Sequence, residues 1–295
     1  MGNCTEPSKR REGDGVPMIT SARPTSPEHA HWYDPKTKLP CHEVKRSKGD
    51  GMRAATLADA RKLGLYPSVT NILSALAKPG LENWKTEQAC LAVLTAPRKD
   101  GEQLDAFVER VLQQEREHEQ EASAAADLGS EAHRILARYI RGETTIAASA
   151  AEKIVRPAIE WLATSHYTNP VAEEILIGDG YAGTCDAILE WNDGTLKLVD
   201  WKTCSTLPKS SAWPEHRLQL AAYARAVNGQ YANGQEIKTM SFYMSTTEPG
   251  KSLMVENPDW HHPYLAFENL LHLWQWVKDY NPTETIDQKL DRVGL

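Results

Sequence analysis

Two acids and a lysine on either side of one turn are the residues of this chain whose types and spacing best suit chemistry. Two apolar, strand-like runs flank the turn sequence Asn192-Asp193-Gly194. Each run carries one acid where a core residue would be expected, Asp186 in the first and Asp200 in the second, and Lys202 follows two residues later. These residues predict a polar site on a β-hairpin.

The length of the turn decides whether the two acids meet. If residues 192–194 form a three-residue loop with the glycine in the left-handed conformation, Trp191 pairs with Thr195 and Asp186 falls opposite Asp200. Side chains alternate between the two faces of a strand, so both acids and the lysine then share one face. A two-residue Asp-Gly loop would place the acids on opposite faces.

The predicted register brings two negative charges together. Carboxylates directly across a ladder repel each other. A divalent cation between them would remove that repulsion, because hard cations such as Mg²⁺ seek carboxylate oxygens. Lys202 beside them would hold a water molecule or a developing negative charge. The hairpin is therefore predicted to be a metal-binding catalytic site.

Composition limits the kind of protein that carries this site. The 295 residues suffice for one large domain, and a net charge of −7 gives no overall basic signature, so a nucleic-acid partner would need a local basic surface. The five cysteines are scattered, and we expect reduced thiols in a cytosolic-type compartment without a zinc or iron–sulfur site. We find no transmembrane-length apolar run and no signal-peptide pattern.

The chain divides into four expected parts. Residues 1–30 are expected to be a disordered tail, whose basic run Lys9-Arg10-Arg11 is either a solvated segment or an arm that touches DNA. Residues 31–126 should form a small hairpin, a basic loop at 45–53 and a group of helices. Residues 127–280 should form the core that holds the site, and residues 281–295 a polar tail.

The apolar periodicity predicts the elements of these parts. Helices come first, followed by a strand, the hairpin, a helix and a strand, and this order predicts an α/β or α+β core with a small mixed sheet and helices on both sides. Helices are expected at 56–64, 68–77, 81–94, 102–120, from Asp127 or Ser130 to 141, and at 147–165, 214–228 and 264–280; strands at 171–177, 181–191, 195–203, 237–245 and, at an edge, 251–256.

Four short motifs lie on these elements in a fixed order. They are Gly129-x-x-x-His133 on a helix, Gly183-x-x-Asp186 and Asp200-x-Lys202 on the two strands, and Gln219-x-x-x-Tyr223 on the next helix. Each motif alone is weak. Together they resemble the PD-(D/E)xK nuclease superfamily, and most closely its RecB-like and phage recombination exonuclease branch. The resemblance implies a restriction-endonuclease-like core.

The resemblance also implies a metal centre. Asp186 and Asp200, with the carbonyl of Trp201, would bind one or two Mg²⁺ or Mn²⁺ ions, and His133 would complete the metal shell. The ions would activate the attacking water. Lys202 would orient that water or stabilise the transition state.

The helix after the hairpin would supply two further catalytic residues. Gln219 and Tyr223 lie one helical turn apart on one face, and would contact a DNA phosphate or position Lys202. The four cysteines that an iron–sulfur subgroup needs around this core are absent from the sequence.

Basic and polar residues beside the motifs are candidate DNA contacts. Arg134 and Arg138 either track a phosphate backbone or form a solvated face paired with nearby glutamates. The loop after Lys202 and the start of the next helix supply four more: Lys209, Ser211, Trp213 and Arg217. Trp213 either stacks on a base or packs where the helix begins.

The expected function is that of a metal-dependent deoxyribonuclease. It would act as an exonuclease, hydrolysing phosphodiester bonds with a metal-activated water in phage-type recombination, repair or DNA degradation in the cytoplasm. DNA ends would be the substrate and a single-strand annealing or binding protein a partner, and a homo-oligomer is compatible with the resemblance. Two alternatives are a catalytically inactive DNA-binding or interaction module on the same fold, and a site-specific endonuclease.

Overall fold

The computed structural model describes most of the chain. It covers residues 31–285 and 288, apart from 47–48, 77–82, 84–85, 88–89, 92, 144–148 and 232–233. The expected N-terminal tail with its basic run, much of the expected helix at 81–94 and most of the expected C-terminal tail lie outside the described residues.

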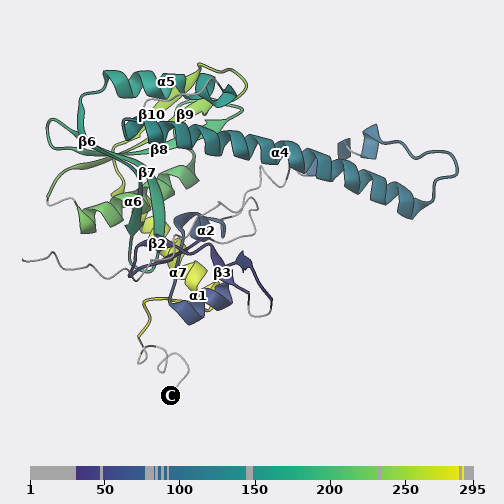
Figure 1. The fold of residues 1–295 in the computed structure, drawn as a ribbon, viewed down its shortest axis with the longest axis horizontal. Helices are drawn as coiled ribbons and strands as arrows, with labels where there is room; N and C mark the ends of the chain where they lie inside the picture. The colour runs from purple at the N-terminus through teal and green to yellow at the C-terminus, as the bar shows by residue number, and fades with distance from the viewer. Residues whose placement is uncertain are drawn as a thin grey trace, which may run out of the picture.

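A mixed sheet of five strands carries the hairpin, in the order β10-β9-β8-β7-β6 (Figure 1). Strands β8 and β9 run parallel, and the other neighbouring pairs are antiparallel. The expected mixed sheet is confirmed, with β9 paired on both sides and β10 at an edge. The bounds are Tyr167–Ile177 (β6), Ala182–Trp191 (β7), Leu196–Cys204 (β8), Ile237–Ser245 (β9) and Ser252–Asn257 (β10).

Helices cover both faces of this sheet, as the sequence predicts (Figure 1). Helix α5 (Ala150–Thr164) and the C-terminal half of α4 (Leu104–Ile140) lie on one face, whereas α6 (Pro214–Gln230) lies on the other, with α7 (His261–Lys278) packed against α6. Val199 and Trp201 of β8 pack with α4 and α5, and Leu198 packs with α6 and α7. Because side chains alternate along a strand, Asp200 and Lys202 belong to the α6 face.

Helix α4 corrects the expectation of two separate helices at 102–120 and from Asp127 or Ser130. It is one continuous helix of 37 residues. The physical reason is the segment 113–126, which contains Gln, Glu, Arg, His, Ala and Ser but no glycine or proline, so nothing ends the helix there. The helix runs through the expected boundary at 126/127, and its N-terminal half projects away from the sheet (Figure 1).

The N-terminal region packs against the α6 side of the core. Strands β1 (Trp32–Asp34), β2 (Leu39–Pro40) and β5 (Tyr66–Pro67) form a small sheet. Helix α1 (Leu57–Leu63) comes before β5 in the chain, and α2 (Val69–Leu73) comes directly after it. The hairpin and both helices match the expectations, including Ser68 as the N-cap of α2. Trp32, Val69 and Ile72 share one buried cluster with α6 and α7.

Several boundaries differ from the expected ones. Two paired strands, β3 (Glu43–Lys45) and β4 (Met52–Ala54), lie at the two ends of the expected loop at 45–53. The sequence does not predict them, because strands of three residues are too short to show an alternation of apolar and polar residues. Strand β6 begins four residues before the expected 171, and α7 begins three residues before the expected 264. Among the described residues, no helix has the length and apolar character needed to cross a bilayer.

Two motif glycines allow helices to approach the sheet closely. A Cβ atom on Gly183 would lie 2.7 Å from Cε1 and 2.9 Å from Oη of Tyr223, whose ring is buried under β7. A Cβ atom on Gly129 would lie 2.9 Å from Oγ1 of Thr203 on β8. Both distances are shorter than carbon atoms tolerate, so these positions fix how near α6 and α4 come to the hairpin.

We expect Gly183→Ala to destabilise the protein. The added methyl group must displace the buried Tyr223 ring, and such overpacking lowers the free energy of unfolding by about 1–3 kcal/mol. Denaturant titration would measure the change. Gly229→Ala is the matched control, because Gly229 lies near the end of α6 with nothing within 4 Å of an added Cβ. Equal unfolding midpoints for the two variants would contradict the close packing of α6 on β7.

Candidate active site

The turn of the hairpin is the three-residue loop that the sequence predicts. Trp191 N–H donates to Thr195 O at 2.8 Å, Gly194 N–H donates to Trp191 O at 2.8 Å, and Gly194 has a φ of 84°. The ladder then pairs Glu190 with Leu196 and continues without a shift to Ala187 and Val199. The predicted pairing of Asp186 with Asp200 would be the next step, but the ladder ends before it. Asp186 contacts His133 of α4, whereas Lys202 contacts Gln219 of α6.

The β7–β8 ladder opens where the acids begin. Its last pair is Ala187 with Val199, whereas the pairing of β8 with β9 continues through Cys204. The N–H of Trp201 donates to Oδ2 of Asp186 at 3.0 Å. A carboxylate thus takes the place of a backbone acceptor, and the two strands separate around the acidic pair.

His133 meets Asp186 across this opening. Its Nδ1 lies 3.1 Å from Oδ1 of Asp186, with both side chains partly buried. His133 is one helical turn after Gly129, the residue that lets α4 approach β8. The structure therefore brings the first two motifs together, with the glycine setting the helix position and the histidine contacting the acid.

A chain of hydrogen bonds joins the other two motifs. Lys202 Nζ donates to Asp200 Oδ1 at 2.8 Å and to Gln219 Oε1 at 3.1 Å. Gln219 Nε2 then donates to Tyr223 Oη at 3.2 Å. Gln219 therefore contacts Lys202, as expected if it positions Lys202, which is one of the two roles that the sequence suggested. Tyr223 accepts a hydrogen bond from the other end of the Gln219 amide.

Burial controls the charges of this cluster. Asp200 is only 2% exposed, and this burial raises its pKa to about 6, with Lys202 opposing the shift and Asp186 adding to it. Burial also acts to raise the pKa of Asp186, but His133, Lys202 and the Trp201 amide outweigh it, so the net pKa is lowered. Burial acts to lower the pKa of Lys202, and the two acids outweigh it and raise that pKa.

The donor atoms of the cluster suit a hard divalent cation. Oδ2 of Asp200 is buried and has no hydrogen-bond partner among the described residues. An orphaned carboxylate oxygen is unfavourable by itself and is the type of ligand that Mg²⁺ or Mn²⁺ takes. The described residues contain no preformed group of three or more His, Cys, Asp or Glu side chains around a metal position. Magnesium, however, is usually held by only one or two carboxylates, so the pair fits it.

The arginines predicted to contact DNA are paired with glutamates. Arg134 forms an ion pair with Glu131, and Arg138 Nε lies 3.0 Å from Glu143 Oε2. These ion pairs match the alternative interpretation of Arg134 and Arg138, in which they form a solvated helix face paired with nearby glutamates. Lys209, Ser211, Trp213 and Arg217, by contrast, are exposed around the start of α6.

Backbone strain lies directly across from the first acid. Glu173 on β6 stands between the pairs Ala172–Ala187 and Glu174–Cys185, so it faces Asp186 in the ladder. Its φ is 57°, which is uncommon for a residue with a side chain. Arg141 forms an ion pair of 2.7 Å with Glu173 beside the opening of the hairpin.

Sequence reasoning missed two tyrosines that border the cluster. Tyr33 Oη lies 3.0 Å from Thr184 Oγ1, and so links β1 to the strand of Asp186. Tyr243 pairs with Lys202 in the β8–β9 register, and its Oη lies 2.8 Å from His216 Nδ1. Neither tyrosine belongs to a motif, and only the tertiary contacts and the parallel register reveal them.

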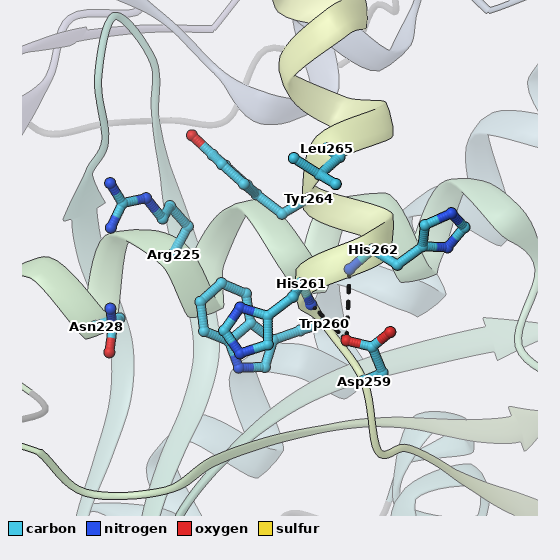
Figure 2. Close-up of a pocket in the computed structure, with 8 residues that line it drawn as sticks. All are labelled: Arg225, Asn228, Asp259, Trp260, His261, His262, Tyr264 and Leu265. Carbon is cyan, nitrogen blue, oxygen red and sulfur yellow. Dashed lines mark hydrogen bonds between the residues drawn. The ribbon is translucent and has the colours of Figure 1, made fainter.

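A pocket of about 450 Å³ lies elsewhere, between α6 and the start of α7 (Figure 2). Asp259 Oδ1 accepts the N–H groups of His261 at 2.9 Å and His262 at 3.4 Å, and Trp260 stacks on His261 (Figure 2). Asp259 thus caps the first turn of α7. None of the residues predicted for the site lines this pocket, so the acidic cluster is a separate place in the fold.

The comparison with protein families agrees with the motifs. No curated protein matches the chain. A solved structure titled "Crystal structure of SSO0001" is similar over 46% of this chain and 68% of its own, with 18% sequence identity and a TM-score of 0.26, values too low to support an argument. The family model of the PD-(D/E)XK nuclease superfamily matches residues 94–289, which include all four motifs. With two thirds of its length matched and the motif residues in contact, this chain belongs to the PD-(D/E)XK nuclease superfamily.

Proposed function

We propose that this nuclease is a metal-dependent deoxyribonuclease that degrades DNA from an end. The observation that carries the proposal is the gathering of Asp186, Asp200 and Lys202 at the open end of the β7–β8 ladder. Such a cluster combines cation ligands with a positive donor, and hydrolysis of a phosphodiester needs both.

Lys202 is proposed to act on the reacting phosphate. An ammonium group has three N–H donors, and Asp200 and Gln219 receive two of them. The third can bind the attacking water or an oxygen of the phosphate. Because Gln219 is buried and held by Tyr223, the ammonium has one defined direction, which is what a preorganised electrostatic stabiliser requires.

Asp186 and Asp200, with the carbonyl of Trp201, are proposed to hold the divalent ion. His133, which the sequence suggested as a further metal ligand, contacts Asp186 and is proposed to orient it. The ion would supply Lewis-acid polarisation of the phosphate and activation of water. His133 fixes Oδ1 and the Trp201 amide fixes Oδ2 of Asp186, so this carboxylate is restrained before any ligand arrives. Restraint of this kind keeps the ligands of a metal site in position.

The preference for DNA ends is proposed from the motif order. The sequence Gly129-x-x-x-His133 upstream of the hairpin resembles the RecB-like and phage exonuclease branch. The exposed Lys209, Ser211 and Arg217 are proposed to contact the backbone of the bound strand. A role in recombination, repair or degradation of DNA, with a strand-annealing protein as partner, is part of the same proposal.

Linear and circular DNA should separate the possible activities. With Mg²⁺ present, we expect linear DNA to be degraded to nucleotides or short oligonucleotides, while covalently closed circles stay intact, because the enzyme needs an end. Gel electrophoresis of a time course would measure this. Discrete fragments from the closed circle would instead identify a site-specific endonuclease, and no degradation of either DNA would support a binding module.

Lys202→Ala should reduce turnover strongly. Loss of one preorganised donor typically lowers kcat by a factor on the order of 10²–10³. Initial rates of Mg²⁺-dependent DNA hydrolysis would measure it, with melting curves to confirm folding. Lys197→Ala is the matched control, because Lys197 lies on the same strand but pairs with Glu256 at 2.8 Å, at the far end. Full activity of Lys202→Ala would contradict the proposed role.

Cation binding should weaken in acid. Asp200 has a pKa raised to about 6, so below this pH it carries a proton that the cation must displace. The apparent Mn²⁺ association constant should therefore fall by up to about tenfold per pH unit below 6, and level off above it. Calorimetric titration would measure this. Asp193→Asn, in the turn, should keep the dependence, whereas Asp200→Asn should lose it; identical affinities of the unmodified protein on both sides of pH 6 would contradict it.

A further inference from the structure

Trp213 is an exposed tryptophan held rigidly beside the acidic cluster. It is 37% exposed, whereas Trp32, Trp201 and Trp274 are at most 2% exposed. Its ring nonetheless makes two aromatic contacts, with Tyr243 at 5.4 Å and 74° and with His216 at 5.3 Å and 60°. The backbone N–H of Trp213 donates to Tyr243 Oη at 3.2 Å. The side chain is thus fixed on one side and open to solvent on another.

The start of α6 does not explain a tryptophan at this position. Trp213 is the N-cap residue, where Ser, Thr, Asp or Asn is preferred because the side chain accepts a backbone N–H. The Trp213 side chain makes no such bond, and Pro214 already starts the helix. Tyr243, from the sheet, holds the backbone instead. The indole therefore does not cap the helix. It contributes only the area of its ring.

The register places this aromatic group next to Lys202. Tyr243 pairs with Lys202 across the parallel β8–β9 ladder, where strands lie about 4.8 Å apart. His216 packs on the same tyrosine, with its Nδ1 2.8 Å from Oη. Tyr243 thus neighbours Lys202 in the sheet and contacts the exposed indole, so a nucleic-acid strand whose phosphate binds Lys202 would carry its neighbouring base toward that indole.

We propose that Trp213, braced by His216 and Tyr243, forms a stacking platform for one unpaired nucleobase of the DNA strand at the active site. The inference rests on the proposed function and narrows it: the bound strand must expose a base next to the reacting phosphate, as a single strand or a frayed end does. Stacking on an aromatic side chain accepts any base, so the platform adds affinity without sequence preference.

The test pairs a protein change with a substrate change. Short single strands of equal length, each lacking one base, are compared with the complete strand; the abasic sugar is stepped from one end to the other. Binding to the full chain is measured by fluorescence anisotropy in EDTA, which prevents cleavage. At one position we expect the abasic sugar to weaken binding to the unmodified protein about tenfold.

The variants distinguish stacking from folding. Trp213→Ala should bind all strands alike, with no loss at the abasic position, whereas Trp213→Phe should keep a partial loss. Trp276→Ala, which changes an exposed tryptophan of α7, should behave as the unmodified protein. A structural role alone would weaken all strands equally. An abasic loss that stays the same in Trp213→Ala, or no abasic loss in the unmodified protein, would overturn the inference.

The same measurements separate this inference from the proposed function. Binding in EDTA does not depend on catalysis, so the platform stands if the unmodified protein shows the position-specific loss and yet cleaves no DNA. The proposed function stands, and the platform does not, if DNA is degraded but no position responds to the abasic sugar. Absence of any DNA binding would overturn both.

Discussion

The fold of the site depends on one buried ion pair, between Lys202 and Asp200. Both groups have lost most of their water, and a buried pair is tolerated only when its remaining donors and acceptors are also satisfied. Gln219 satisfies a second donor of Lys202, and Tyr223 satisfies Gln219. One oxygen of Asp200 has no partner among the described residues. A hard divalent cation is a ligand that would suit this carboxylate oxygen.

The rest of the architecture brings these groups to one place. The hairpin contributes both acids and the lysine, α4 adds His133, and α6 adds Gln219 and Tyr223. The two helices approach the hairpin from different sides, and a glycine allows each close contact. Gly129 of α4 lies against Thr203 of β8, and Gly183 of β7 lies against Tyr223 of α6. The motif glycines are therefore requirements of packing, and the charged motif residues meet only because the packing is this tight.

The sequence predicts the hairpin better than its surroundings, for physical reasons. A turn of three residues with glycine in the left-handed position fixes the register, and the register fixes which side chains face each other. The same reasoning fails for α4, because caps at Asp127 and Ser130 are local signals that a good helix-forming segment overrides. Tyr33 and Tyr243 could not be predicted, since their places depend on contacts between elements far apart in the chain. The roles of the motif residues stay predictions.

The β7–β8 ladder ends where the two acids begin. A closed ladder would direct its hydrogen bonds between strands and leave no room between the acids. Here the Asp186 carboxylate accepts a hydrogen bond from the Trp201 N–H of β8. On the other side of Asp186, in β6, lies Glu173 with its positive φ. Strain of this kind persists only when surrounding contacts hold it, and it recurs at functional sites. The ion pair of Glu173 with Arg141 supplies such a contact from the end of α4. Residues of α4 and its C-cap therefore contact both Asp186, through His133, and the strand opposite it, through Arg141.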